Sequence, residues 1–213
     1  MSFLKAPIEQ YALRYSDPEL KALKSLSRET YGKMKIPQML AGHLQGHVLQ
    51  MVSQMVRPQR VLEIGTFTGY SAICLAAGLR NKGVLHTIDI DPAAQEIAMR
   101  FFKRAGLGNR IIMHCGNALS IIPAMKGYFD IVYIDADKKN YCRYFDLVFP
   151  KIRKGGWLLA DNMFWDGQAL MPPGRQDRET KAIIAFARKI SGDRRLNKFI
   201  LPIRDGIMIA GKR

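Results

Sequence analysis

The chain has 213 residues, a length that suits one domain with a substantial buried core. Apolar residues make up 48% and charged residues 24%, as in ordinary globular proteins, and no apolar run approaches the roughly 20 residues that a membrane span needs. The N-terminus lacks the apolar core of a signal peptide, so we expect a cytoplasmic protein with no membrane contact. Three widely spaced cysteines exclude a disulfide framework and a zinc-finger pattern.

The formal net charge of +15 is the unusual bulk property of the chain. A field of this sign attracts polyanions or acidic substrates. The basic residues are spread along the chain and do not gather in one tail, so a basic solvated surface without a dedicated partner is the simpler interpretation. Binding to nucleic acid stays open.

The first 56 residues predict helices. Residues 17–33 carry leucines at helical spacing, with Asp17 placed as N-cap and Pro18 in the first turn. Residues 39–55 resume the helical pattern after a break.

His43 and His47 lie four residues apart on this second helix and could in principle chelate a metal ion. No third ligand is nearby in the sequence. We therefore interpret them as ordinary packing or surface histidines.

From residue 57 onward the chain alternates strands and helices. We predict strands at 61–64, 84–88, 111–114, 131–134, 157–160, 199–201 and 206–210, and helices at 70–77, 92–105, 119–125, 141–152 and 177–190. Parallel strands need helical crossovers, whereas the short connection between the last two strands requires an antiparallel hairpin. The pattern predicts an α/β fold: a doubly wound, mostly parallel, seven-stranded sheet with a C-terminal antiparallel hairpin. We expect a single domain, 1–213, with N-terminal helices in 1–56 and the α/β core in 57–213.

Oxygen-bearing side chains follow two of these strands. Asp135 comes directly after the strand at 131–134, and Asp161 and Asn162 follow the strand at 157–160. Because the carboxyl ends of parallel strands open onto the ligand crevice, neighbouring strands would bring these three side chains together. Such oxygens suit Mg²⁺ or Ca²⁺, and Lys138 lies one turn beyond the first carboxylate, within reach of whatever the ion holds. The alternative is that the acidic residues only cap the helices that follow.

Residues 63–71 form the turn after the first strand, where a dinucleotide-binding fold has Gly-x-Gly-x-x-Gly. Phe67 occupies the position of the second glycine, and Glu63 places a carboxylate at the mouth of this loop. Both features disfavour the binding of a pyrophosphate. A ligand with an ammonium and a carboxylate fits better, and S-adenosylmethionine has both groups in its methionine arm. Asp89 ends the second strand, where it can accept the ribose hydroxyls, and Asn117 follows the third strand at a depth suited to the adenine. The alternative is an unrelated α/β fold with a glycine loop.

Several motifs in this order resemble the cation-dependent O-methyltransferases, the family of catechol and caffeoyl-CoA O-methyltransferases. The resemblance runs from about Met39 to the end of the chain, and its most specific pieces are residues 63–71, 135–141, 161–165 and 204–206. It implies a Rossmann-like class I methyltransferase fold that uses S-adenosylmethionine and a divalent cation, Mg²⁺ or else Ca²⁺ or Mn²⁺. The implied reaction is methylation of a catechol-type vicinal hydroxyl on a small molecule, and family members commonly form homodimers.

The resemblance also implies roles for individual residues. Asp135, Asp161 and Asn162 would be metal ligands, Lys138 would be the general base in contact with the substrate, and Trp165 would form part of the acceptor wall. The residues implied for the S-adenosylmethionine site are Met39, Ala41, Glu63, Gly65, Thr66, Tyr70, Ser71, Asp89, Asn117, Ala118 and Asp135.

The chain departs from the family pattern at two positions. The family usually has a serine or threonine near Ala41 and an acidic residue near Gln45, and this chain has neither. We expect the difference to affect how the methionine end is bound and to reshape the acceptor mouth.

Two other functions compete with a small-molecule methyltransferase. One is a tRNA hydroxyuridine O-methyltransferase of the same fold, which the +15 charge favours through phosphate contacts, although the charge is dispersed and no appended RNA-binding segment is visible. The other is a cofactor-binding regulatory protein without chemistry. The complete set of Asp135, Lys138, Asp161 and Asn162 argues against it.

Overall fold

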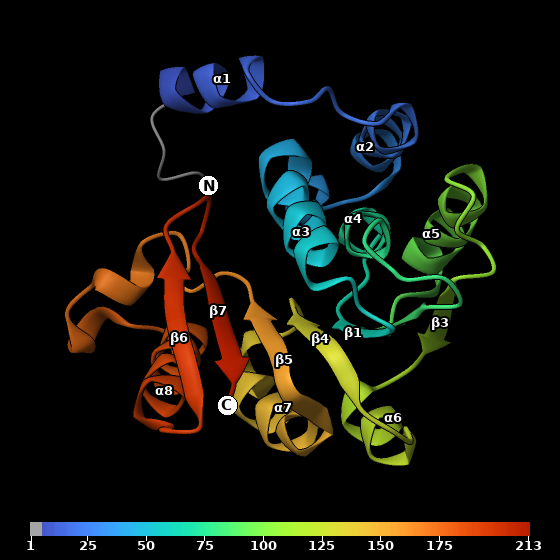
Figure 1. The fold of residues 1–213 in the computed structure, drawn as a ribbon. Helices are drawn as coiled ribbons and strands as arrows, with labels where there is room; N and C mark the ends of the chain where they lie inside the picture. Colours follow the sequence, from blue (N-terminus) through green and yellow to red (C-terminus); the bar gives the residue numbers. More distant parts are fainter. Residues whose placement is uncertain (1–5) are drawn as a thin grey trace. The chain divides into compact units, whose positions relative to one another are not determined.

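The computed structural model describes residues 6–213. These residues group into two compact units, 6–117 and 118–213, whose helices and strands are labelled in Figure 1. That the chain forms a single domain stays a prediction. None of the helices in the described range combines the length and the apolar character that crossing a membrane requires.

The unit of residues 6–117 begins with helices α1 (Ala6–Arg14), α2 (Lys21–Lys33) and α3 (Gly42–Val56), with a 3₁₀ turn η1 (Pro37–Met39) between the last two. The prediction that Asp17 caps α2 is wrong, because the helix begins only at Lys21. The main-chain oxygen of Asp17 lies 2.8 Å from Nε2 of His47, and Oε1 of Glu19 accepts a 2.7 Å hydrogen bond from the hydroxyl of Tyr70. These contacts hold the segment before α2 against α3 and against Tyr70. This segment therefore does not form the first turn of α2.

Three parallel strands follow, namely β1 (Arg60–Ile64), β2 (Val84–Asp89) and β3 (Ile111–Cys115), separated by helices α4 (Tyr70–Ala76) and α5 (Pro92–Arg104). Strand β2 pairs with β1 on one side and with β3 on the other. Most side chains of β1 are fully buried, as expected for a strand covered on both faces. Ile64 is paired with Ile88, so the loop after β1 begins beside the end of β2.

Residues 118–213 contain strands β4 (Phe129–Ile134), β5 (Ile152–Ala160), β6 (Leu196–Leu201) and β7 (Ile207–Lys212). Their helices are α6 (Ala118–Ala124), α7 (Tyr141–Val148) and α8 (Arg178–Gly192), with 3₁₀ turns η2 (Lys138–Asn140), η3 (Phe149–Lys151), η4 (Gln168–Leu170) and η5 (Pro173–Arg175). Strands β4 and β5 are parallel, and β7 runs antiparallel to both β5 and β6 (Figure 1). The predicted C-terminal hairpin is therefore confirmed. One unit contributes three strands and the other contributes four, so the described residues contain the seven strands that were predicted.

The boundary between α7 and β5 differs from the prediction of a helix over 141–152. Helix α7 ends at Val148, and Ile152 already begins β5. Pro150 has no N–H to donate along the helix, which ends the regular α-helical pattern. Strand β5 therefore begins before residue 157, where the prediction placed its start. Gly155, with a φ of 70°, lies inside the strand and interrupts the alternation of apolar and polar side chains by which a strand is recognised in a sequence.

Candidate functional site

The ends of β4 and β5 lie side by side, which is the condition on which the predicted set of oxygens depends. Ile134, the last residue of β4, is paired with Ala160, the last residue of β5. Asp135 directly follows β4 and Asp161 directly follows β5, and the N–H of Asp161 donates to the carbonyl of Ile134 at 3.0 Å. The two carboxylates therefore leave adjacent strands at the same edge.

Both carboxylates reach the hydroxyl of one tyrosine. Tyr133 is fully buried, and its Oη lies 3.3 Å from Oδ2 of Asp161 and 3.5 Å from Oδ2 of Asp135. The other oxygen of Asp161 accepts the N–H of Asn162 at 2.7 Å. No role was predicted for Tyr133, although its two-residue spacing from Asp135 places both on one face of an extended chain.

Lys138 is buried beside these carboxylates. Its Nζ donates to Oδ1 of Asp135 at 3.0 Å and to the hydroxyl of Tyr141 at 2.8 Å. Burial raises the pKa of Tyr141 well above its ordinary value of 10, so this phenol stays neutral and accepts from the ammonium. The Nζ also lies 5.7 Å from the centroid of the Trp165 ring, which brings the residue expected at the acceptor wall to the same place.

Asn162 is held from the opposite side by Asp205, which lies between β6 and β7. The amide nitrogen of Asn162 donates to Oδ2 of Asp205 at 2.9 Å, so the amide oxygen is the atom left to act as a ligand. Asp205 is buried, and burial raises its pKa, opposed by the hydrogen bonds from Asn162 and from the N–H of Asp166.

The oxygens of Asp135, Asp161 and Asn162 form a hard donor set of two carboxylates and one amide, which fits Mg²⁺, Ca²⁺ or Mn²⁺. Among the described residues there is no group of three or more His, Cys, Asp and Glu side chains that could hold a metal ion. The predicted set is of a different kind, because its third donor is an amide. The convergence of both carboxylates on Tyr133 is the observation that supports the fit.

In the unit of residues 6–117, the loop after β1 is fixed by the end of β2. Oδ2 of Asp89 accepts the N–H groups of Thr66 at 2.9 Å and of Phe67 at 2.7 Å. Glu63 is fully buried at the end of β1 and accepts a 2.5 Å hydrogen bond from Oγ1 of Thr87. Glu63, which was predicted to bind the ammonium, and Asp89, which was predicted to bind the ribose, are therefore both held at the loop after β1.

The other residues predicted to bind the methyl donor differ in how exposed their side chains are. Met39 is 58% exposed, whereas Ala41, Tyr70 and Ser71 are buried. Gly65 opens the loop with a φ of 95°, and the hydroxyl of Tyr70 is engaged by Glu19. Asn117 follows β3 at the end of this unit, and Ala118 begins α6 in the other unit. A role for each of these residues in binding the donor stays a prediction.

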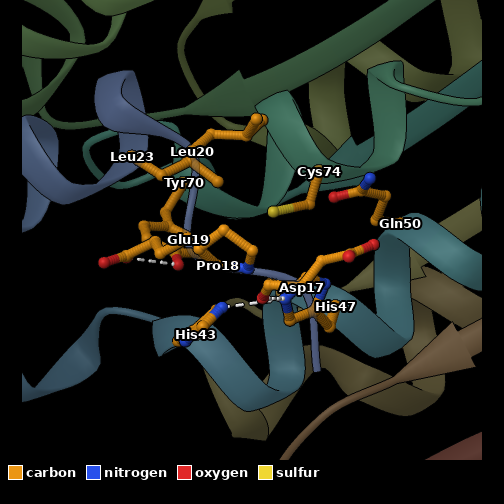
Figure 2. Close-up of a pocket in the computed structure, with 11 residues that line it drawn as sticks. Asp17, Pro18, Glu19, Leu20, Leu23, His43, His47, Gln50, Tyr70 and Cys74 are labelled. Atoms are coloured by element: carbon orange, nitrogen blue, oxygen red, sulfur yellow. Dashed lines mark hydrogen bonds between the residues drawn. The ribbon is translucent and has the colours of Figure 1, made fainter. Parts of the chain in front are cut away.

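A cavity of about 230 Å³ lies between α3, α4 and the segment before α2 (Figure 2). His43 and His47 point into it from one face of α3, with their Nε2 atoms 2.8 Å apart. Nε2 of His47 also contacts the main-chain oxygen of Asp17. This arrangement agrees with the packing role expected for the two histidines.

Comparisons with known proteins identify the family of the chain. A model of the O-methyltransferase family matches residues 14–213. A caffeoyl-CoA O-methyltransferase from Petroselinum crispum is 30% identical over 94% of this chain and 88% of its own, and a catechol O-methyltransferase from Niastella koreensis is 34% identical over 69% and 66%. The crystal structure of the O-methyltransferase from Bacillus cereus in complex with SAH is 27% identical, covers 97% of both chains and superposes with a TM-score of 0.89. This likeness confirms the predicted class I methyltransferase fold.

Proposed function

The chain belongs to the O-methyltransferase family and uses S-adenosylmethionine, and we propose that it methylates, with a divalent cation, one of two adjacent hydroxyls on a small catechol-type molecule. The observation that supports the cation and the acceptor class is the convergence of Asp135 and Asp161 on the hydroxyl of Tyr133, with Lys138 beside them. The names of the caffeoyl-CoA and catechol relatives point to the same kind of acceptor. Homodimerisation is part of the proposal and is measured by light scattering.

Asp135, Asp161 and Asn162 would hold the cation through two carboxylates and an amide oxygen. A divalent ion bound there supplies a positive charge that lowers the pKa of a phenolic hydroxyl from about 10 and orients its oxygen. Mg²⁺ suits these hard oxygen donors, and Ca²⁺ or Mn²⁺ would serve as alternatives.

Lys138, as the neutral amine, would take the proton from the acceptor hydroxyl onto its Nζ. Its position is restrained by Asp135 and by the neutral phenol of Tyr141, at 3.0 Å and 2.8 Å. Removal of the proton leaves the acceptor oxygen anionic, as displacement at a sulfonium methyl group requires. The Trp165 ring near Nζ would cover one side of the acceptor and exclude water.

The methyl donor would be bound by the loop after β1. Glu63 would receive the ammonium of the methionine arm, and Asp89 would accept the ribose hydroxyls with the oxygen that does not hold Thr66 and Phe67. The other residues proposed for this site are Met39, Ala41, Gly65, Thr66, Tyr70, Ser71, Asn117, Ala118 and Asp135.

The metal role is tested by Asp135→Ala and Asp161→Ala in a methyl-transfer assay with a panel of catechols, labelled S-adenosylmethionine and added Mg²⁺. We expect both variants to lose metal-dependent turnover and to keep a cooperative unfolding transition. Asp146→Ala is the matched control, because Asp146 is an exposed carboxylate on α7 that pairs with Lys189 at 2.6 Å. Full activity of either site variant in chelator-treated buffer would falsify the metal role.

A hydroxylated uridine in tRNA is the second acceptor considered, and the net charge of +15 favours it. Contacts to phosphates would make tRNA binding weaken steeply with salt, because each neutralised phosphate releases counterions. Turnover of a free catechol at a rate typical of enzymes, without salt-sensitive tRNA binding, selects the small-molecule acceptor. Turnover of tRNA alone selects the other.

A further inference from the structure

The loop that follows β5 is attached to the turn between β6 and β7. The N–H of Met163 donates to the carbonyl of Gly206 at 3.0 Å, and the N–H of Phe164 donates to the carbonyl of Asp205 at 2.8 Å. The Phe164 ring also covers Gly206, where a Cβ would lie 2.9 Å from the ring and the φ is 82°. These contacts bring the Asp205 side chain against the loop.

Both carboxylate oxygens of Asp205 accept hydrogen bonds from this loop. Oδ2 accepts the side-chain amide of Asn162 at 2.9 Å, and Oδ1 accepts the N–H of Asp166 at 2.8 Å. Asp205 is 6% exposed, so water does not readily replace these bonds. The two bonds fix the first and the last residue of the segment that carries Trp165.

The backbone of this segment needs such support. Asn162, Trp165 and Asp166 have φ values of 59°, 49° and 50°, in the left-handed region. Asparagine and aspartate tolerate that region, but it is unusual for a bulky residue such as tryptophan. Conformations of this kind persist where surrounding contacts over-determine them, and they concentrate at functional sites.

We infer that Asp205 is a positioning residue of the metal site, which acts by holding the Asn162 amide with its nitrogen turned away and its oxygen toward the carboxylates of Asp135 and Asp161. The inference rests on the proposed function, because it requires a divalent ion at these oxygens. In this role Asp205 would touch neither the acceptor nor the ion. It selects which end of the Asn162 amide faces the site.

The test substitutes Asp205 and Asn162, singly and together, so that the carboxylate and the amide change places. The Mn²⁺ affinity of the whole protein is measured by titration calorimetry, and SAH binding serves as a check of folding. In Asp205→Asn, the new amide has only one acceptor oxygen for two N–H donors, so one of them faces an NH₂ group. Loss of a residue that orients a ligand lowers metal affinity 10- to 100-fold, and we expect the Mn²⁺ Kd to rise about tenfold.

Adding Asn162→Asp reverses the polarity of the pair. The amide at position 205 then donates to the carboxylate at position 162 and still accepts the N–H of Asp166. Asp205→Asn should therefore weaken Mn²⁺ binding when position 162 is asparagine and strengthen it when position 162 is aspartate. A structural role of Asp205 that does not act through Asn162 cannot produce this change of sign.

Asp193→Asn is the matched control. Asp193 lies before the opposite end of β6 and accepts three hydrogen bonds from Arg195, and its substitution should leave the Mn²⁺ Kd unchanged. If Asp205→Asn alone does not fold, Asn162→Asp is compared with the double variant, and tighter binding by the double variant supports the inference.

The outcomes separate the inference from the function on which it rests. Absence of Mn²⁺ binding by the unaltered protein overturns the proposed metal site and the inference together. Mn²⁺ binding that Asp205→Asn leaves unchanged, or that it weakens equally in both backgrounds, overturns the inference alone.

Discussion

Replacing Lys138 by methionine is expected to lower turnover and, at the same time, to tighten binding of the divalent ion. Methionine has an unbranched side chain one atom shorter than that of lysine, so it keeps most of the apolar stem beside Tyr141 and Trp165, but it has no ammonium. The Lys138 side chain is 8% exposed, and its Nζ lies 3.0 Å from Oδ1 of Asp135. An ion that binds Asp135 has to compete with this ammonium.

The two effects have different sizes. Loss of a general base lowers kcat by about 10²- to 10⁴-fold. A hydrogen bond to a charged group stabilises by about 1.5–3 kcal/mol, and an ion that no longer displaces it gains about 10- to 150-fold in affinity at 1.36 kcal/mol per tenfold. Activity and affinity should therefore move in opposite directions.

The assay combines methyl transfer to a catechol at saturating Mg²⁺ with calorimetric titration of Mn²⁺ and of SAH. Lys139→Met is the matched control, because Lys139 is about half exposed and lies 3.7 Å from Glu179, away from the carboxylates. Weaker Mn²⁺ binding in Lys138→Met refutes the reasoning, since it means that the Lys138 ammonium does not compete for Asp135. An unchanged kcat refutes it as well, since it means that the neutral amine of Lys138 does not take the proton.

Three further predictions concern the hydroxyl of Tyr133, the glycine that ends the loop after β1, and the ion pairs of Glu29 on α2. Tyr133→Phe removes the hydroxyl shared by the two carboxylates and should lower the free energy of unfolding by about 1 kcal/mol and Mn²⁺ affinity about tenfold, measured by urea denaturation and calorimetry. Gly69→Ala should lower the free energy of unfolding by more than about 1 kcal/mol, because the φ is 92° and the new Cβ would lie 2.6 Å from the Phe102 ring, whereas Gly32→Ala in α2, with no atom within 4 Å, should not destabilise. Hydrogen bonds, first from Arg100 and then from Lys33, lower the pKa of Glu29 to about 2 from its ordinary 4.5. Glu29→Gln should therefore remove about 1 kcal/mol of stability, which is fully present above pH 4.5 and is lost as the pH falls toward 2. Equal pH dependence of the free energy of unfolding in the variant and in the unaltered protein would contradict this prediction.

The metal site illustrates what local sequence can predict. A short apolar run between helices identifies a buried strand, and the geometry of parallel sheets then places the next residues at a common edge. Asp135 and Asp161 obey both rules, and the pairing of Ile134 with Ala160 is what brings them together. The same rules placed Asp89 beside the loop after β1, because β1 and β2 are also paired at their ends.

Contacts between distant segments were not predictable in this way. Asp205 lies 43 residues from Asn162, and only the antiparallel pairing of β5 with β7 brings its turn to the loop after β5. Asp17 has the residue type of an N-cap, but its contact with His47 overrides that preference. Helix α1 was not predicted from the sequence, and it buries none of its residues.

The polar contacts of the site have one physical cause. The carboxylates of Asp161, which is buried, and of Asp135, which is partly exposed, repel each other, and a charge removed from water requires compensation by hydrogen bonds or by opposite charge. The ammonium of Lys138, the hydroxyl of Tyr133 and the N–H of Asn162 supply that compensation to Asp135 and Asp161. The groups that keep the carboxylates together are therefore the groups that set their affinity for a cation, and substitutions among them should alter stability and metal binding in a coupled way.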